Sequence, residues 1–227
     1  MKNTNFAETL SSDFYARPTI SVAVDLLSNI LVHQTSKGAV AGEIVEVEAY
    51  LGEKDPACHA FYGKTKRTKV FWENPGTVYV FVNYGIHFCL NAITRTSQAV
   101  GCVLIRALEP TVGIHVMEEN RKTNGHLALT NGPAKLTQAL GITLAHNGAN
   151  FTQGSLRILG NEEPPNIVVT SRVGITKAKE EPLRFYKDGC PFVTPQNKLP
   201  RFFAGTQEMV KNAFRDGTLR VSIADTN

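Results

Sequence analysis

Three polar side chains alternate along one strand-like segment of the sequence. Residues 39–51 vary with the period of two that is typical of a β-strand. One predicted face is apolar and carries Val45, Val47, Ala49 and Leu51. The other predicted face carries Ile44, Glu46, Glu48 and Tyr50. A carboxylate on such a face is usually solvated, but beneath a cleft it can serve as a general base. Alternate residues lie roughly 6.5–7 Å apart along a strand, and the pattern alone does not choose between Glu46 and Glu48.

A predicted β-hairpin adds aromatic rings. Strand-like residues 77–82 and 87–93 flank a turn around residues 83–86. Tyr79 and Phe81 share one face of the first strand, where rings usually pack in a core but can also stack on a planar ligand. Tyr84 lies in the turn itself, where a large ring has little core to enter. Exposed rings at loop tips often insert between stacked bases or contact a partner.

Two segments are candidates for binding phosphate. Residues 64–69 place four cations in six positions, namely Lys64, Lys66, Arg67 and Lys69. Such a run is usually a solvated loop, and a weak nuclear localisation patch is an alternative. Beside an aromatic hairpin it could equally hold phosphates. Asn131-Gly132-Pro133 predicts a helix start, with Asn131 able to cap. The free amides there, reinforced by Lys135, would attract an anion, although the alternative is simply a capped helix.

The spacing of histidines and cysteines predicts no metal site. The six histidines form no HxxxH or HExxH pair, and the four cysteines form no CxxC pair. A metal-dependent hydrolase built on His59, His87 and Glu48 is therefore the weakest alternative. Neither GxSxG nor GxxxxGK[ST] occurs. Scattered cysteines indicate a reducing compartment.

The remaining pattern mixes helices and strands without a regular βαβ alternation. An amphipathic helix is predicted over residues 21–32, and a strand over residues 101–107. Helical patterns follow from Pro110 to about Arg121 and from Pro133 to Leu140. Residues 147–166 are expected to be loop around a strand at 156–159, and further short strands are expected in 166–175 and 183–189. This mixture predicts an α+β fold in a single mixed domain spanning residues 1–227, with residues 1–12 a possible flexible N-terminus.

Bulk properties narrow the class of protein. The 227 residues are 42% hydrophobic and 19% charged, as in an ordinary globular protein. A net charge of +4 suits a polyanionic partner but also many enzymes. There is no signal-peptide-like start and no run of 18 apolar residues, so we expect an intracellular protein without a membrane span. That compartment would be the cytoplasm in a bacterium and the nucleus in a eukaryote.

Several segments, in this order along the chain, resemble the alkyladenine or 3-methyladenine DNA glycosylase family. The matching segments are residues 14–27, GEIVEVEAYLG (42–52), His59, TKRTK (65–69), PGTVYVFVNYGIHFCLN (75–91), VLIRALEP (103–110), NGPAKLTQALGI (131–142), RVGI (172–175) and PLRFY (182–186). The resemblance covers almost the whole chain. It implies a curved, mainly antiparallel sheet flanked by helices, with a protruding hairpin.

The resemblance also assigns roles to individual residues. Glu48 looks like the general base that deprotonates the attacking water, and Arg106 like a partner of that water or of the adjacent phosphate. The base pocket would be walled by Tyr50, His59, Tyr79, Phe81 and Asn91. Phe81 stands where better-known relatives have a tyrosine, so the ring is kept and its hydroxyl is lost. Tyr84 looks like the side chain that fills the gap left by the extruded nucleotide.

The implied activity is that of a monofunctional DNA glycosylase. Such an enzyme would flip alkylated purines, hypoxanthine or ethenoadenine out of duplex DNA and hydrolyse the N-glycosidic bond, leaving an abasic site. The partner would be double-stranded DNA containing a damaged purine, the protein a monomer, and no cofactor is expected. The alternative is a nucleic-acid-binding module without catalysis, because the fold is shared in part with an RNA-binding domain of formyltransferases.

Overall fold

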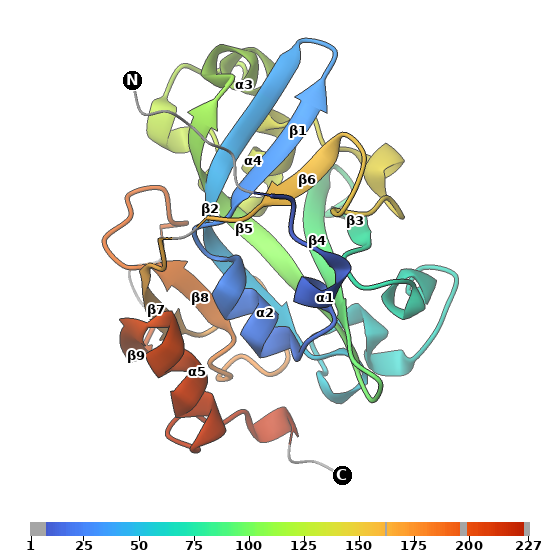
Figure 1. Ribbon diagram of the computed structural model, residues 1–227, viewed down its shortest axis with the longest axis vertical. Coiled ribbons are helices and arrows are strands. Elements are labelled where there is room, and N and C mark those ends of the chain that lie inside the picture. The colour runs from blue at the N-terminus through green and yellow to red at the C-terminus, as the bar shows by residue number, and fades with distance from the viewer. Residues whose placement is uncertain (1–7, 162, 196–198, 225–227) are drawn as a thin grey trace.

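One antiparallel sheet organises the protein. The computed structural model describes residues 8–161, 163–195 and 199–224, and within them nine strands form this sheet (Figure 1). The strands are β1 (Ile30–Thr35), β2 (Gly38–Tyr50), β3 (Val78–Asn83), β4 (His87–Arg95), β5 (Val100–Val112), β6 (Leu156–Leu159), β7 (Asn166–Thr170), β8 (Arg184–Lys187) and β9 (Arg201–Thr206). Their main path runs β3-β4-β5-β2-β8-β7-β9, while β1 pairs with β2 and with β6.

Strand β2 is the centre of this arrangement. Along one edge it pairs with β5. Along the other, its first half pairs with β1 and its second half with β8, from Glu46 to Glu48. Side chains in the second half of β2 are therefore enclosed by neighbours on both sides.

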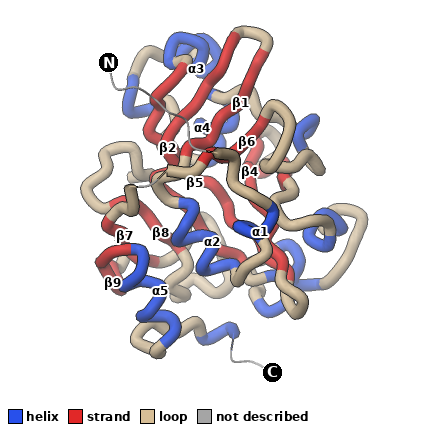
Figure 2. The backbone as a smooth tube through the Cα atoms, viewed as in Figure 1, coloured by secondary structure: helices blue, strands red, loops and turns tan. Residues whose placement is uncertain are grey.

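Helices pack around the sheet and connect its strands (Figure 2). The α-helices are α1 (Ser12–Tyr15), α2 (Thr19–Leu26), α3 (Ile114–Arg121), α4 (Pro133–Ala139) and α5 (Gln207–Arg215), and the 3₁₀ turns are η1 (Gly52–Lys54), η2 (His59–Tyr62), η3 (Lys69–Trp72), η4 (His126–Ala128), η5 (Leu144–His146) and η6 (Ser222–Ala224). Helix α2 packs on β2 and β5, α4 on β4 and β5, and α5 on β7, β9 and α2. None of the described helices is long and apolar enough to cross a membrane.

The α+β fold class, the hairpin β3–β4 and the strand β6 agree with the sequence predictions. The predicted alternation of side chains between the two faces of the hairpin is also observed. Val78 and Val80 lie in the main core, whereas Tyr79 and Phe81 belong to a second cluster on the other face. Residues 1–7 of the N-terminus expected to be flexible lie outside the described part of the chain, and Thr9 bridges Leu159.

The predicted helix over residues 21–32 is wrong in its second half. Helix α2 ends at Leu26, because Ser28 takes a positive φ of 71° and turns the chain. Hydrogen bonds from Ser28 N to Ile44 O and from Ile44 N to Asn29 O then begin the pairing with β2. The apolar spacing continued into Ile30 and Leu31 because a buried strand needs such residues too.

Because of a β-bulge, some side chains of β2 lie on the face of the sheet opposite to the one predicted. The pairing with β5 shifts register on either side of Glu46, and an extra residue moves its neighbours to the opposite face. Ile44 consequently joins Val47 in the main core, while Val45 packs with Ala107 and Phe192 on the other side.

Two further boundaries differ from prediction, and several elements were missed, among them α1 and β1. Strand β5 continues through Pro110 to Val112, and helix α3 begins only at Ile114. Pro110 is tolerated because it faces Gly42 at another register shift. Strand β9 and helix α5 were not predicted.

Candidate active site

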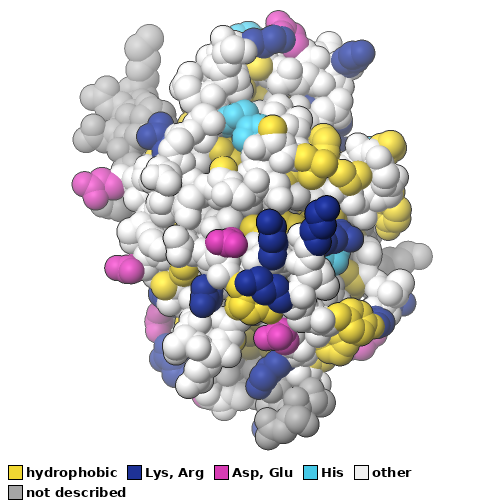
Figure 3. Space-filling view, turned by 90° about the vertical axis from the view of Figure 1, so that its right-hand side faces the viewer, with side chains coloured by type: hydrophobic (Ala, Val, Ile, Leu, Met, Phe, Trp, Pro, Cys, Tyr) yellow, Lys and Arg dark blue, Asp and Glu magenta, His cyan; other side chains and the backbone are white. Residues whose placement is uncertain are grey.

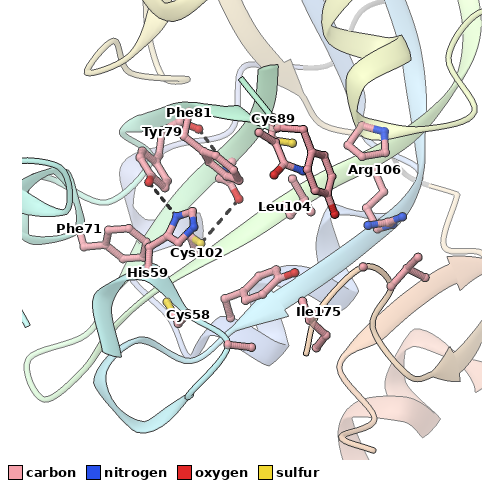
Figure 4. A pocket seen from close by; sticks show the side chains of 18 residues that line it. Cys58, His59, Phe71, Tyr79, Phe81, Cys89, Cys102, Leu104, Arg106 and Ile175 are labelled. Atoms are coloured by element: carbon pink, nitrogen blue, oxygen red, sulfur yellow. Dashed lines mark hydrogen bonds between the residues drawn. The ribbon is translucent and has the colours of Figure 1, made fainter. Parts of the chain in front are cut away.

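A cavity of about 250 Å³ lies where η2, the hairpin and the loop after β7 meet (Figure 4). Seven residues singled out in the sequence line it: Tyr50, His59, Tyr79, Phe81, Tyr84, Asn91 and Arg106. In the view of Figure 4, the rings of Phe71, Tyr79 and His59 gather at one end and Arg106 lies at the other. The structure therefore brings the predicted pocket residues together from four separate segments.

Glu48 lies behind the cavity wall and is fully buried. Its Oε1 accepts a hydrogen bond from the backbone N–H of Val173 at 2.7 Å and lies 3.2 Å from Nη1 of Arg106. Its Oε2 accepts from the Tyr50 hydroxyl at 2.9 Å. Three donors thus contact this one buried carboxylate, and all three donor residues line the cavity.

Glu46 occupies the same face of β2 and is also fully buried. Its Oε1 accepts from Nε of Arg106 at 2.8 Å and from Nε of Arg184 at 2.7 Å, and its Oε2 accepts from Thr194 N at 2.6 Å. Burial opposes the charge, but the two arginines and the Thr194 N–H leave the pKa of Glu46 below its usual value. Glu46 therefore holds Arg106 from one side while Glu48 contacts it from the other, a role that the sequence had not revealed.

Tyr50 is fixed by a second buried ion pair that sequence reasoning missed. Arg172 donates to both carboxylate oxygens of Asp55 and to the carbonyl of Ala49. Its guanidinium also lies over the Tyr50 ring, 4.7 Å from the centroid. Burial, and then the adjacent Glu48, raise the pKa of Tyr50 well above its usual value, so the hydroxyl stays a donor.

At the aromatic end, His59 is held between Tyr79 and Arg67. Nδ1 of His59 is 2.9 Å from the Tyr79 hydroxyl, and Arg67 Nη2 is 3.3 Å from Nε2. Arginine can only donate, so Nε2 accepts and Nδ1 carries the proton. Burial and then Arg67 lower the pKa of His59 to about 4, which makes the ring neutral near pH 7. Phe81 packs edge-on against His59, with centroids 4.6 Å apart.

Asn91 is oriented by the strand beside it. Its Nδ2 donates to the carbonyl of Tyr79 at 3.1 Å, and its Oδ1 accepts from Sγ of Cys102 at 3.7 Å. Cys58, Cys89 and Cys102 all line the cavity. Their scattered positions had given no signal that they would meet, and burial raises the pKa of Cys89 to about 11.

The hairpin tip, residues 84–86, is strongly exposed. Tyr84 is 80% and Ile86 74% exposed, and Tyr84 adopts a positive φ of 49°. The prediction that the Tyr84 ring would find little core is confirmed, and the ring reaches the edge of the cavity.

The basic residues fall into different settings. Lys64, Lys66, Arg67 and Lys69 are exposed and do not line the cavity, although Arg67 contacts two residues that do. Lysine and arginine side chains gather on the face shown in Figure 3, beside hydrophobic ones. Asn131 does not cap α4, as had been predicted; Gly132 is the N-cap, and Asn131 Oδ1 accepts from Lys135 Nζ at 2.7 Å. Among the described residues, no three His, Cys, Asp or Glu side chains form a metal-binding group.

Comparison of the sequence with known proteins shows which family it resembles. The family model of methylpurine-DNA glycosylases matches residues 13–191. A protein of Methanoculleus marisnigri is 49% identical over 191 residues, which are 82% of this chain and 98% of the relative. Relatives from Prosthecochloris aestuarii and Carboxydothermus hydrogenoformans are 45% and 44% identical, over 83% and 82% of this chain and 92% and 98% of their own lengths. All three bear the name "Putative 3-methyladenine DNA glycosylase".

Proposed function

The chain belongs to the methylpurine-DNA glycosylase family and is a DNA glycosylase, and on this premise we propose that it excises damaged purines from duplex DNA by Glu48-assisted hydrolysis. The observation that carries the proposal is the buried Glu48 carboxylate, which three cavity-lining residues hold at the wall of an aromatic pocket.

The hydrogen bonds on Glu48 leave one acceptor position unused. A carboxylate has about four lone-pair sites. Two donors reach Oε1 and one reaches Oε2, so Oε2 retains an acceptor position. A water bound there would lose its proton to Glu48 as its oxygen bonds to C1′ of the sugar. The C1′–N9 bond breaks at the same centre, and its electron pair leaves with the purine.

The charges behind the cavity suit the transition state of this reaction. Glycosidic cleavage develops positive charge on the sugar, which a fixed carboxylate stabilises. Arg106 is shared between two carboxylates, so its own charge is offset within the protein. A cationic alkylated purine leaves without further protonation, whereas hypoxanthine needs a proton on its ring.

The aromatic rings of the pocket and the exposed hairpin tip suit the extrusion and binding of the base that precede hydrolysis. His59, Tyr79 and Phe81 would contact the extruded base, and the neutral His59 presents no charge to an alkylated, cationic purine. Asn91 lines the same wall. Tyr84, 80% exposed, would occupy the gap in the stack. The exposed cations Lys64, Lys66, Arg67 and Lys69 would contact phosphates, as would Lys135 of α4.

The lining of the cavity supports simple hydrolysis. Strand cleavage by a lyase needs an amine that forms a Schiff base with the sugar. Among the described residues that line the cavity, none is a lysine. The product would therefore be an abasic site in an intact strand.

A lesion panel tests the proposal. Purified protein would be incubated with duplexes carrying hypoxanthine, ethenoadenine, 3-methyladenine, 7-methylguanine or uracil. Free base would be measured by chromatography, and abasic sites by cleavage with alkali. We expect release of one or more damaged purines but not of uracil, with strand breaks only after alkali. Tight binding of every duplex without release of any base would support the non-catalytic module instead.

A further inference from the structure

The carboxylate of Glu46 has no place in the reaction just described, yet three groups donate to it. It is fully buried and accepts from three groups on three different segments: Arg106 of β5, Arg184 of β8 and Thr194. A buried carboxylate with this many charged donors is costly unless its partners are placed accurately. The arrangement therefore fixes the positions of those partners.

Arg106 is the partner that reaches the reaction site. Its Nε is 2.8 Å from Glu46 Oε1, and its Nη1 is 3.2 Å from Glu48 Oε1. One planar guanidinium thus spans both carboxylates. Because the guanidinium is rigid, the hydrogen bond from Arg106 Nε to Glu46 fixes the direction from which Nη1 approaches Glu48.

Thr194 closes this network from outside the family match. Its N–H donates to Glu46 Oε2 at 2.6 Å, and its carbonyl accepts from Arg184 Nη2 at 3.3 Å. The family model ends at residue 191.

The segment that carries Thr194 is anchored on both sides. Phe192 is 5% exposed and packs on Val45 and Ala107, next to the bulge in β2. Further along, β9 pairs with β7, and Gln207 at the start of α5 donates to the carbonyl of Val24. The backbone of Thr194 is thereby held against Glu46.

We propose that residues 192–194 form a positioning segment, which sets Arg106 against Glu48 through the Thr194 N–H and Glu46. This inference rests on the proposed function, because it assumes that Glu48 and Arg106 serve the hydrolysis. Thr194 and Glu46 are positioning residues and do not line the cavity.

Thr194→Pro tests the proposal, with Thr194→Ala as its matched control. Proline removes the N–H, whereas alanine keeps it and removes only the hydroxyl. Base release would be measured in single turnover with enzyme in excess, on a duplex that the wild type processes, and the dissociation constant on the same duplex. We expect Thr194→Pro to slow release by about 10- to 100-fold, because small displacements at a reacting centre are costly. Duplex affinity should stay near that of the wild type, and Thr194→Ala should behave as the wild type in both.

A pH profile separates positioning from a loss of stability. The titratable and charged groups around Glu48 are Tyr50, Cys89, Arg106 and Arg172. A displaced Arg106 would stabilise the Glu48 carboxylate less, so the acid limb of the release rate should move to higher pH in Thr194→Pro. A variant that is merely less stable would keep the acid limb of the wild type in its folded fraction.

Glu46→Gln covers the case in which Thr194→Pro does not fold. It keeps the side-chain shape and removes the charge that holds Arg106, so the same slow release and shifted acid limb are expected. Wild-type release and an unshifted acid limb in a folded variant of either kind would overturn the inference. If the wild type itself released no purine, the proposed function would fail first, and the two failures are thus distinguishable.

Discussion

Strand β2 behind the cavity and the tip of the β3–β4 hairpin both reverse the usual distribution of buried and exposed side chains. Behind the cavity, Glu46 and Glu48 are charged and completely buried, while at the tip Tyr84 and Ile86 are apolar or aromatic and more than 70% exposed. Each reversal costs free energy in the isolated protein, through desolvation inside and through exposed apolar surface outside. Buried charges held by several donors are typical of a reaction site, and exposed rings on a narrow turn are typical of a surface that contacts a partner. The comparison therefore separates a buried region proposed to carry the chemistry from an exposed region proposed to contact DNA.

The largest effect on stability is expected from Arg106→Met. The substitution leaves two buried carboxylates short of a cation, and breaking a buried ion pair typically costs about 3–5 kcal/mol. Denaturant unfolding would measure the loss, and base release should disappear as well. If unfolding changed by less than about 0.5 kcal/mol, a value typical of surface sites, Arg106 would not be the neutralising group.

Tyr84→Ala should weaken DNA binding and leave the stability of the fold almost unchanged. The ring touches little of the folded protein, so the free energy of unfolding should change by no more than about 0.5 kcal/mol. Affinity for a lesion duplex should fall by roughly 10- to 100-fold, because stacking of one ring on bases contributes about 1–3 kcal/mol. Fluorescence anisotropy with labelled duplex would measure this loss. Unchanged affinity together with reduced stability would contradict the claim that the Tyr84 ring contacts DNA and adds little to the fold.

A smaller effect is expected from the pH dependence of His59. Its pKa is lowered to about 4 in the fold, against 6.5 ordinarily, so the unfolded chain takes up the proton first. The stability linked to His59 is complete above pH 6.5 and is lost as the pH falls towards 4. At pH 4.5 the loss should be on the order of 1–2 kcal/mol, allowing for partial exposure. Urea midpoints of the wild type and His59→Asn, measured from pH 7 to 4.5, should converge on acidification; parallel curves would contradict a neutral His59 with a lowered pKa.

Local features of the fold could be predicted, and long-range ones could not. The hairpin follows from alternating residues around a turn, which are all within reach of one another. The role of Glu46 depends on Arg106, Arg184 and Thr194, which lie 60, 138 and 148 residues away in the chain. No spacing rule connects them. The helix ending at Leu26 and the bulge at Glu46 were likewise decided by pairing with distant strands.

The same division applies to the candidate site. The line of Glu46, Glu48 and Tyr50 could be recognised on one strand, although not which carboxylate faces the cavity wall. The Val173 N–H that holds Glu48 is a backbone group, and no side-chain pattern identifies it. Arg67 was predicted to bind phosphate. Its contact with His59 depends on how the loop folds against the hairpin, which the sequence pattern does not show.

Glu48→Gln provides the most direct test of the central claim. The amide keeps the shape of the carboxylate but cannot take a proton from water, so the variant should bind a lesion duplex about as tightly as the wild type. Single-turnover base release should fall by about 10²–10⁴-fold, the usual contribution of a general base. Release at the wild-type rate by a folded Glu48→Gln protein would contradict the account.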